Sequence, residues 1–279
     1  MNKLMKYVAI MFGACLFACD DNETEISDQG LDEITFSENI MVESGDEVDE
    51  VIAERTRFGF GKGGIKGGLG GFLGCATISE ETPEDADYPL IITIDYTEGC
   101  NATLWDITKS GKIIITLTGA PDEAGSQRII TYDNYMVNDH LIEGTRTYTN
   151  NGDGSHTVTL VDGKITTPEG AEITRTSTRT KTLVSGGDTE DRSDDVFEIT
   201  GSASGTNAEG VSYSKTITSP LVKRKDCLWI TSGTVEENSG DDQVVVDFGD
   251  GTCDNLATRT ENGVSEEIEM NFKVRRKKR

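Results

Sequence analysis

The feature that most constrains the fold is a strand pattern that continues from Cys75 almost to the end of the chain. Threonine, valine and isoleucine alternate with polar residues in segments such as YPLIITIDY, GKIIITLTG, SHTVTLV and DDVFEITG. Turn-forming clusters separate these segments, among them APDEAG, NNGDG, TPEG, GTNAEG and NSGDD. No stretch shows the 3.6-residue apolar period that a helix needs. We therefore expect an all-β domain, an antiparallel meander of roughly a dozen strands forming a curved sheet, a sandwich or an open barrel.

One strand of this meander differs from the others, because neither of its faces is apolar. The segment EITRTSTRTKTL places threonines on one face and basic residues, including Arg175, Arg179 and Lys181, on the other. Such a strand is expected at an exposed edge, in a single-layer sheet that is wet on both sides, or along a polar groove.

The N-terminus has the pattern of an export signal. Lys3 and Lys6 form a basic start, and residues 7–18 form an apolar stretch too short to span a bilayer. The sequence LFAC that ends this stretch resembles the lipobox of bacterial lipoproteins, which implies cleavage before Cys19 and acylation of its sulfur. The alternative is an ordinary signal peptide with a cysteine nearby. We expect residues 1–18 to be a lipoprotein signal peptide and Cys19 to be the membrane anchor.

Two further regions separate this anchor from the β-domain. Residues 19–57 hold fourteen acidic residues against two arginines, which is typical of a solvated, disordered tether. Residues 58–74 contain nine glycines in seventeen positions, which favours a flexible linker. The acidic run behind Cys19 resembles the signal that sends Bacteroidota lipoproteins to the outer face of the outer membrane. In other Gram-negative lineages, an aspartate directly after the cysteine resembles an inner-membrane retention signal. The resemblance implies lipid anchoring in the outer membrane, facing the cell surface.

The charge of the chain limits its partners. Fifty acidic against 26 basic residues give a net charge of −24, which argues against nucleic acid as a partner. The basic end KVRRKKR, residues 273–279, is the local exception. It is expected to be a solvated chain end, with contact to phosphate or lipopolysaccharide as the alternative.

The two ends of the β-domain, residues 75–279, resemble each other. CATISEETPEDADYPLIITIDYTEGC begins one copy and CLWITSGTVEENSGDDQVVVDFGDGTC begins the other. The order of cysteine, isoleucine, alternating apolar residues, Asp and aromatic residue is shared. We interpret residues 75–118 and 227–272 as duplicated end hairpins.

The cysteine spacing within these copies predicts two disulfides. The midpoint between Cys227 and Cys253 falls in NSGDD, and the midpoint between Cys75 and Cys100 falls in PEDADYP. Both are turn signals, so each pair would lie across a hairpin at a distance that a disulfide can bridge. A four-cysteine zinc site is the less favoured alternative, because no C-x-x-C pair exists.

The sequence contains no recognisable catalytic motif, so we expect no catalytic residue and no enzyme activity. The segment DFGDGTCD, with Asp247, Asp250 and Asp254, and the segment NNGDG, with Asn151 and Asp153, offer oxygen ligands for calcium. Neither fits the calcium-loop register, and both residue types are ordinary in tight turns. Calcium thus stays the one candidate cofactor, and no carboxylate pair for hydrolysis is singled out.

The order of the segments IDYTEGC, SGKIIITLTG, YDNYMVND, EITGSASGTNAEGVSY and DFGDGTCDNLATRTENG resembles a family of Bacteroidota surface lipoproteins. The resemblance covers most of residues 75–270 and implies a β-rich, surface-located protein without implying an activity. Three functions are considered: a non-catalytic structural or binding module for a glycan or protein, a carrier of a lipid or other apolar ligand in a curved sheet, and a carboxylate-pair hydrolase. The first needs no catalytic residue, and we expect it.

Overall fold

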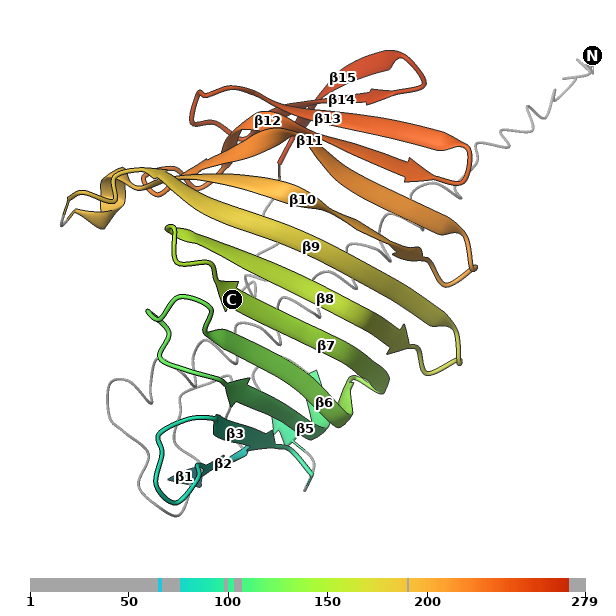
Figure 1. Ribbon diagram of the computed structural model, residues 1–279. Coiled ribbons are helices and arrows are strands. Elements are labelled where there is room, and N and C mark those ends of the chain that lie inside the picture. The colour runs from blue at the N-terminus through green and yellow to red at the C-terminus, as the bar shows by residue number, and fades with distance from the viewer. Residues whose placement is uncertain (1–64, 67–75, 98–99, 103–106, 190, 271–279) are drawn as a thin grey trace, which may run out of the picture.

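The computed structural model describes residues 65–66, 76–97, 100–102, 107–189 and 191–270, and these form one curved antiparallel sheet (Figure 1). The all-β prediction is confirmed, and of the three expected arrangements the structure adopts the open, curved sheet. A single turn of 3-10 helix, η1 (Arg192–Asp194), accompanies the strands. The strands are β1 (Ile65–Lys66), β2 (Thr77–Glu81), β3 (Leu90–Asp95), β4 (Cys100–Ala102), β5 (Ile107–Leu117), β6 (Gln127–Val137), β7 (His140–Asn150), β8 (Ser155–Thr166), β9 (Glu172–Ser185), β10 (Val196–Thr206), β11 (Ser212–Arg224), β12 (Ile230–Ser239), β13 (Asp242–Asp250), β14 (Leu256–Glu261) and β15 (Val264–Glu269).

The strands follow one another across the sheet in chain order. The exception is β4, which pairs with β5 off the main path, so that β3 and β5 are neighbours. Short turns with positive φ angles make this meander possible. Asn138 and Asp139, with φ of 48° and 64°, join β6 to β7, and Asn262 and Gly263, with φ of 50° and 79°, join β14 to β15. Asn, Asp and Gly are the residues that tight hairpins require at these positions.

The apolar core lies on one face of the sheet, which we call the core face. Its residues alternate along the strands and align across them: Ile92 pairs with Ile115, and Ile115 pairs with Ile130. All three side chains are fully buried. Burying a side chain of this size contributes about 1.5–3 kcal/mol. The same cluster continues from β2 to β9 through Ile78, Leu90, Ile94, Tyr96, Ile113, Leu117, Tyr135, Val137, Ile142, Leu160, Ile165 and Ile173.

The opposite face is rich in hydroxyl groups and is called the threonine face. Its centre is β9, whose residues Thr174, Thr176, Thr178, Thr180 and Thr182 stand opposite Thr and Ser residues of β8 and β10 along most of their length. Hydroxyl pairs link neighbouring strands, as between Thr157 and Thr180 at 3.2 Å. The expectation that this strand lies at an edge is wrong, because β9 is paired on both sides. The expectation of a sheet that is wet on both sides does not hold along the whole strand, because Ile173 and Arg175 are buried. The strand does line a polar hollow, through Thr174, Arg175 and Thr176.

A line of irregularities, which we call the crease, crosses the sheet from β5 to β10 at Gly111, Gly144, Gly163 and Gly205. The register shifts at the first three of these positions, or next to them, in the β5–β6, β7–β8 and β8–β9 ladders. The backbones approach so closely that a Cβ on Gly144 would lie 2.8 Å from the Cα of Gly163, and a Cβ on Gly205 would collide with the Thr174 carbonyl oxygen. Bulges of this kind bend strands and increase twist. The crease therefore contributes to the curvature seen in Figure 1.

The two end hairpins are alike in outline and different in register. Val246 corresponds to Ile94 in the repeat, but Ile94 pairs with Ile78 whereas Val246 pairs with Val235. The first hairpin has a long connection, residues 82–89, and the second has a two-residue turn. The first copy is fully buried at Ile92, Ile94 and Tyr96, while its counterparts Val244, Val246 and Phe248 are only half-buried.

Two residues of the predicted glycine-rich linker take part in the sheet. Ile65 and Lys66 form β1, which pairs with Ile78 and Thr77 at the edge of β2. The acidic tether, the signal peptide and the basic C-terminal end all lie outside the described residues. Within the part of the chain that the structure describes, no helix is long and apolar enough to cross a membrane.

Candidate functional site

A polar hollow of about 710 Å³ opens where the crease crosses the middle of the sheet, and we call it the crease hollow. Five consecutive strands, β6 to β10, supply its lining. The crease glycines Gly144, Gly163 and Gly205 belong to its lining. The remaining lining consists of Thr131, Tyr132, Glu143, Thr145, Asp162, Lys164, Thr174, Arg175, Thr176 and Ser204.

The charged groups of the crease hollow are partly paired with one another. Lys164 Nζ lies 2.8 Å from Glu143 Oε2 and 3.4 Å from Glu172 Oε1. Hydrogen bonding to Glu143, and then to Glu172, raises the pKa of the Lys164 ammonium above its usual value. Lys164 is therefore protonated at neutral pH and can donate hydrogen bonds. A lysine that acts as a general base needs a lowered pKa, which is the opposite shift.

The hydroxyl groups of the hollow are held by the strand ladders. The Thr174 and Thr206 hydroxyls lie 2.8 Å apart, and the backbone N–H of Thr206 donates to Thr174 Oγ1 at 3.0 Å. Thr176 and Ser204 stand opposite each other on β9 and β10 and are exposed. These hydroxyls offer both donors and acceptors to a polar ligand.

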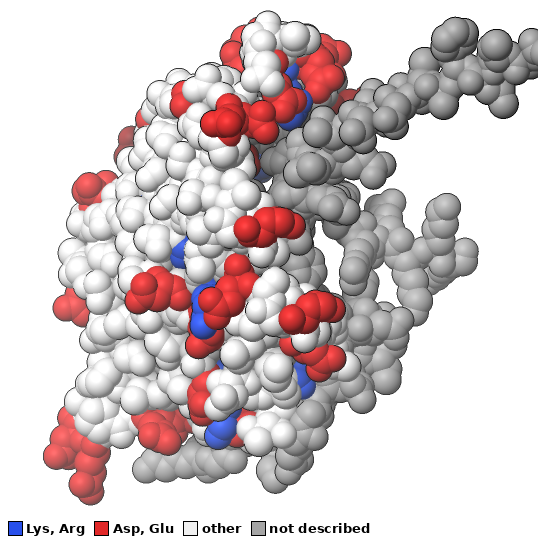
Figure 2. All heavy atoms as spheres, turned by 90° about the vertical axis from the view of Figure 1, so that its right-hand side faces the viewer, with Lys and Arg blue, Asp and Glu red and all other residues white. Residues whose placement is uncertain are grey.

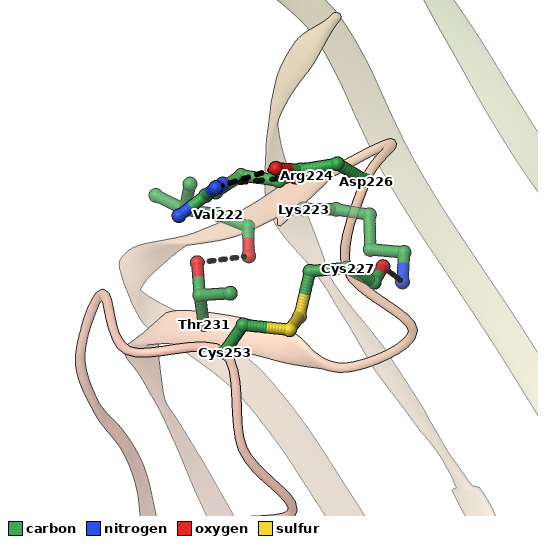
Figure 3. Close-up of polar contacts among 7 residues, drawn as sticks. All are labelled: Val222, Lys223, Arg224, Asp226, Cys227, Thr231 and Cys253. Atoms are coloured by element: carbon green, nitrogen blue, oxygen red, sulfur yellow. Dashed lines mark hydrogen bonds and ion pairs between the residues drawn. A yellow bond between two sulfur atoms is a disulfide. The ribbon is translucent and has the colours of Figure 1, made fainter. Parts of the chain in front are cut away.

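The predicted disulfide between Cys227 and Cys253 is present, with the two Cα atoms 5.8 Å apart (Figure 3). Cys227 is buried in the connection before β12, and Cys253 follows β13, so the bond closes the hairpin beyond its last paired residues. Lys223 Nζ donates to the carbonyl oxygens of Cys227 and Leu228, at 2.6 Å each. The disulfide and this lysine together fix the β11–β12 connection.

The remaining predicted cysteine sites fall mostly outside the described residues. Cys19 and Cys75 are both outside, so the lipid anchor and one half of the first predicted disulfide stay predictions. Cys100 belongs to β4, opposite Lys109 of β5, and its side chain is not among those described.

The candidate calcium ligands at the C-terminal end serve their own turns. Asp247 Oδ1 accepts a hydrogen bond from the N–H of Gly249 at 2.9 Å, and Asp254 Oδ1 accepts one from Leu256 at 3.0 Å. Asp250 Oδ1 accepts from the hydroxyl and the N–H of Thr252 at 2.7 and 3.2 Å, which lowers the pKa of the Asp250 carboxyl.

The second candidate loop shows the same arrangement. Asp153 Oδ1 accepts from the hydroxyl and the N–H of Ser155 at 2.6 and 3.0 Å, and these bonds lower the pKa of Asp153. Asn151 Nδ2 donates to Ser155 Oγ and Thr157 Oγ1. Asx turns explain these residue types without a metal. Among the described residues, no group of three or more His, Cys, Asp or Glu side chains could hold a metal ion.

The two signs of charge are distributed unequally over the molecule. Acidic side chains predominate over basic ones on the side shown in Figure 2. By contrast, the cross-strand register places Arg146 and Lys215 on the core face, in one row with Ile130, Leu160 and Ala203. On β9, Arg175, Arg179 and Lys181 alternate with the threonines and so also belong to the core face.

Sequence reasoning did not identify the glycines of the crease or the residues that line its hollow. Gly144, Gly163 and Gly205 each interrupt a strand pattern, which was the available signal, since an isolated glycine in a strand often marks a bulge. Their alignment across the sheet depends on register, and a single sequence does not reveal it. The polar character of β9, by contrast, was visible from its alternation of threonine and basic residues.

Comparisons with sequence models of protein families, with curated proteins and with solved structures give no match. The functional conclusion therefore depends on the geometry and the chemistry of the sites described above.

Proposed function

We propose that the protein is a lipid-anchored, non-catalytic binding module at the outer surface of the outer membrane, which binds a polar chain such as a glycan in the crease hollow. The observation that carries the proposal is the hollow itself. Its volume of about 710 Å³ lies within the range of about 300–1,000 Å³ typical of ligand sites. Its lining is mainly hydroxyl, charged and backbone groups, with one aromatic ring from Tyr132.

The chemistry of the lining favours binding over catalysis. Hydroxyls such as those of Thr176 and Ser204 can exchange hydrogen bonds with the hydroxyls of a sugar. Lys164, the lysine of the hollow, is held protonated between two glutamates. The net charge of −24 makes a neutral or cationic ligand a better match than a polyanion at this site.

The proposed membrane anchor is Cys19, supported by the lipobox-like sequence that precedes it. The sheet begins at Ile65, 46 residues further along the chain.

The test of the binding proposal is a comparison of two threonines on the same strand. Thr176 lines the hollow, whereas Thr178 lies two residues further along the same face of β9 and is not part of the lining; both are exposed. After a glycan array has identified an oligosaccharide, its affinity for the full chain is measured by isothermal titration calorimetry. We expect Thr176→Val combined with Ser204→Ala to weaken binding about tenfold, since each lost hydrogen bond is worth about 0.5–1.5 kcal/mol.

Thr178→Val is the matched control and should leave the affinity unchanged. Equal losses from the two variants would contradict the crease hollow as the binding site. An array on which no polar chain is bound would contradict the proposed ligand class.

A further inference from the structure

A second hollow, of about 280 Å³, lies on the core face toward the C-terminal half of the sheet, and we call it the core-face hollow. It shares no residue with the crease hollow. Its lining comes from β9 to β13 and is mainly apolar: Ile199, Ala203, Ile217, Leu221, Ile230, Val235 and Phe248, with Arg179, Gly201, Ser202 and Lys215 completing it.

Two short cross-strand rows contain apolar residues of this hollow. Ile199 pairs with Leu221 between β10 and β11, and Ile217 pairs with Val235, which in turn pairs with Val246. Ile199, Ile217 and Leu221 are only half-buried, in contrast to the fully buried core of the other end. Apolar surface that remains partly accessible in a concave site is what a hydrocarbon chain can cover.

Basic side chains border the core-face hollow. Arg179 and Lys215 belong to the lining itself, and Lys215 lies 3.4 Å from the carboxylate of Glu237. Lys181 stands opposite Ile199 in the ladder, and its Nζ lies 3.9 Å from the centre of the Phe197 ring. Lys223 stands opposite both Phe197 and Ile230.

The positive charges of the lysines along this border repel one another. Partial burial is the main cause that lowers the pKa of Lys181, and the charge of Lys225 adds to it, while Asp195 acts in the opposite direction. Partial burial also lowers the pKa of Lys223, followed by repulsion from Lys181 and Lys225. An anion placed among these lysines would relieve the repulsion.

We propose that the core-face hollow binds an acyl chain with an anionic head group, a carboxylate or a phosphate, whose tail covers Ile217, Leu221 and Phe248 and whose head lies beside Lys181. Lys181 is partly desolvated by its neighbours but still exposed at the surface, and it supplies the contact with the head group. The Nζ donors of Lys223 are committed to the carbonyls of Cys227 and Leu228, so this residue contributes positive potential and not a direct contact. The disulfide of Cys227 fixes the loop that holds it (Figure 3).

Charge complementarity selects this ligand class. A neutral hydrocarbon would leave the repulsion among the lysines in place, and a small anion without a tail would leave the apolar lining in contact with water. The acidic character of the rest of the molecule repels anions, so the attraction is confined to this border of the sheet.

The test uses the full chain with its native disulfide and three short amphiphiles below their micelle-forming concentrations. Decanoate, decyl phosphate and decanol are titrated by isothermal titration calorimetry, with inorganic phosphate as the tail-less control. We expect at least one of the two anionic compounds to bind at least tenfold more tightly than decanol, and inorganic phosphate not to bind measurably. Comparing decanoate with decyl phosphate distinguishes a fatty acid from a phosphorylated lipid as the source of the head group.

Two variants locate the ligand, and a third is the control. Lys181→Gln should weaken the anionic compounds about tenfold and leave decanol unchanged, whereas Ile217→Thr should weaken all three. Lys112→Gln removes a lysine of β5 that lies 3.0 Å from Asp95, away from the hollow, and should change nothing. Equal affinity for decanol and both anions, or an unchanged affinity in Lys181→Gln, would overturn the proposal. Neither result depends on whether a glycan binds in the crease hollow.

Discussion

Replacing Gly205 by alanine tests the role of the crease most sharply. A Cβ at this position would collide with the carbonyl oxygen of Thr174 on the neighbouring strand. The same carbonyl accepts a hydrogen bond from the Tyr213 hydroxyl at 3.4 Å, and Thr174 and Thr206 share two further hydrogen bonds there. Overpacking costs about 1–3 kcal/mol, and weakening of two hydrogen bonds adds about 1–3 kcal/mol. We therefore expect Gly205→Ala to lower the free energy of unfolding by about 2–6 kcal/mol.

The measurement is urea unfolding of the full chain, with the loss read from a lower midpoint at an unchanged slope. Gly210→Ala is the matched control: Gly210 has a φ of 77°, and nothing lies within 4 Å of a Cβ placed there. Its cost is the conformational cost alone, about 1–2 kcal/mol. If Gly205→Ala destabilises no more than Gly210→Ala, the close approach at the crease is not a constraint on the sheet, and our reasoning about it is refuted.

Three further predictions concern the disulfide, an Asx turn and the anchor. Replacing Cys227 and Cys253 together by serine should lower the free energy of unfolding by about 3.5 kcal/mol, given the sequence separation of 26 and the chain-entropy model. Chemical denaturation without reductant measures this loss. A loss below about 1 kcal/mol would contradict the prediction. Thr252→Val should raise the pKa of Asp250 toward its ordinary value, as measured by an NMR titration. Because the folded pKa is lowered, the stabilisation by this carboxylate is present above about pH 4 and is lost as the pH falls through the folded pKa. An unchanged pKa in the variant would show that the Thr252 hydroxyl has no influence. Cys19→Ala should move the protein from the membrane fraction to the soluble fraction after cell lysis, and a variant that stays with the membranes would disprove the anchor.

The strands could be predicted from the sequence because their signals are local. Alternation in YPLIITIDY and GKIIITLTG identified β3 and β5, and clusters such as NNGDG and NSGDD identified turns. Whether the sheet stays open, closes or folds into two layers depends on twist and on bulges added over many strands. These depend on contacts between residues such as Gly205 and Thr174 that lie far apart in the chain, and local patterning contains no information about them.

The candidate sites could be predicted only in part, for the same reason. The midpoint argument identified the Cys227–Cys253 pair because a hairpin fixes its own register. It did not extend to the two hollows, whose linings combine residues of five strands each. The aspartates considered as calcium ligands are ambiguous in sequence, because Asx turns and calcium loops use the same residue types. The hydrogen bonds that Asp247 and Asp250 accept within their own loops identify Asx turns.

Hydrogen–deuterium exchange with and without a bound oligosaccharide tests the central claim, a polar ligand in the crease hollow, most directly. The account predicts that the ligand slows exchange of backbone amides along the crease, at Gly144, Gly163 and Gly205 and in the strand residues beside them. Amides at the far end of the sheet, in β14 and β15, should exchange at the same rate in both states. Protection confined to β14 and β15, or no protection of the crease at a saturating ligand concentration, would contradict the claim.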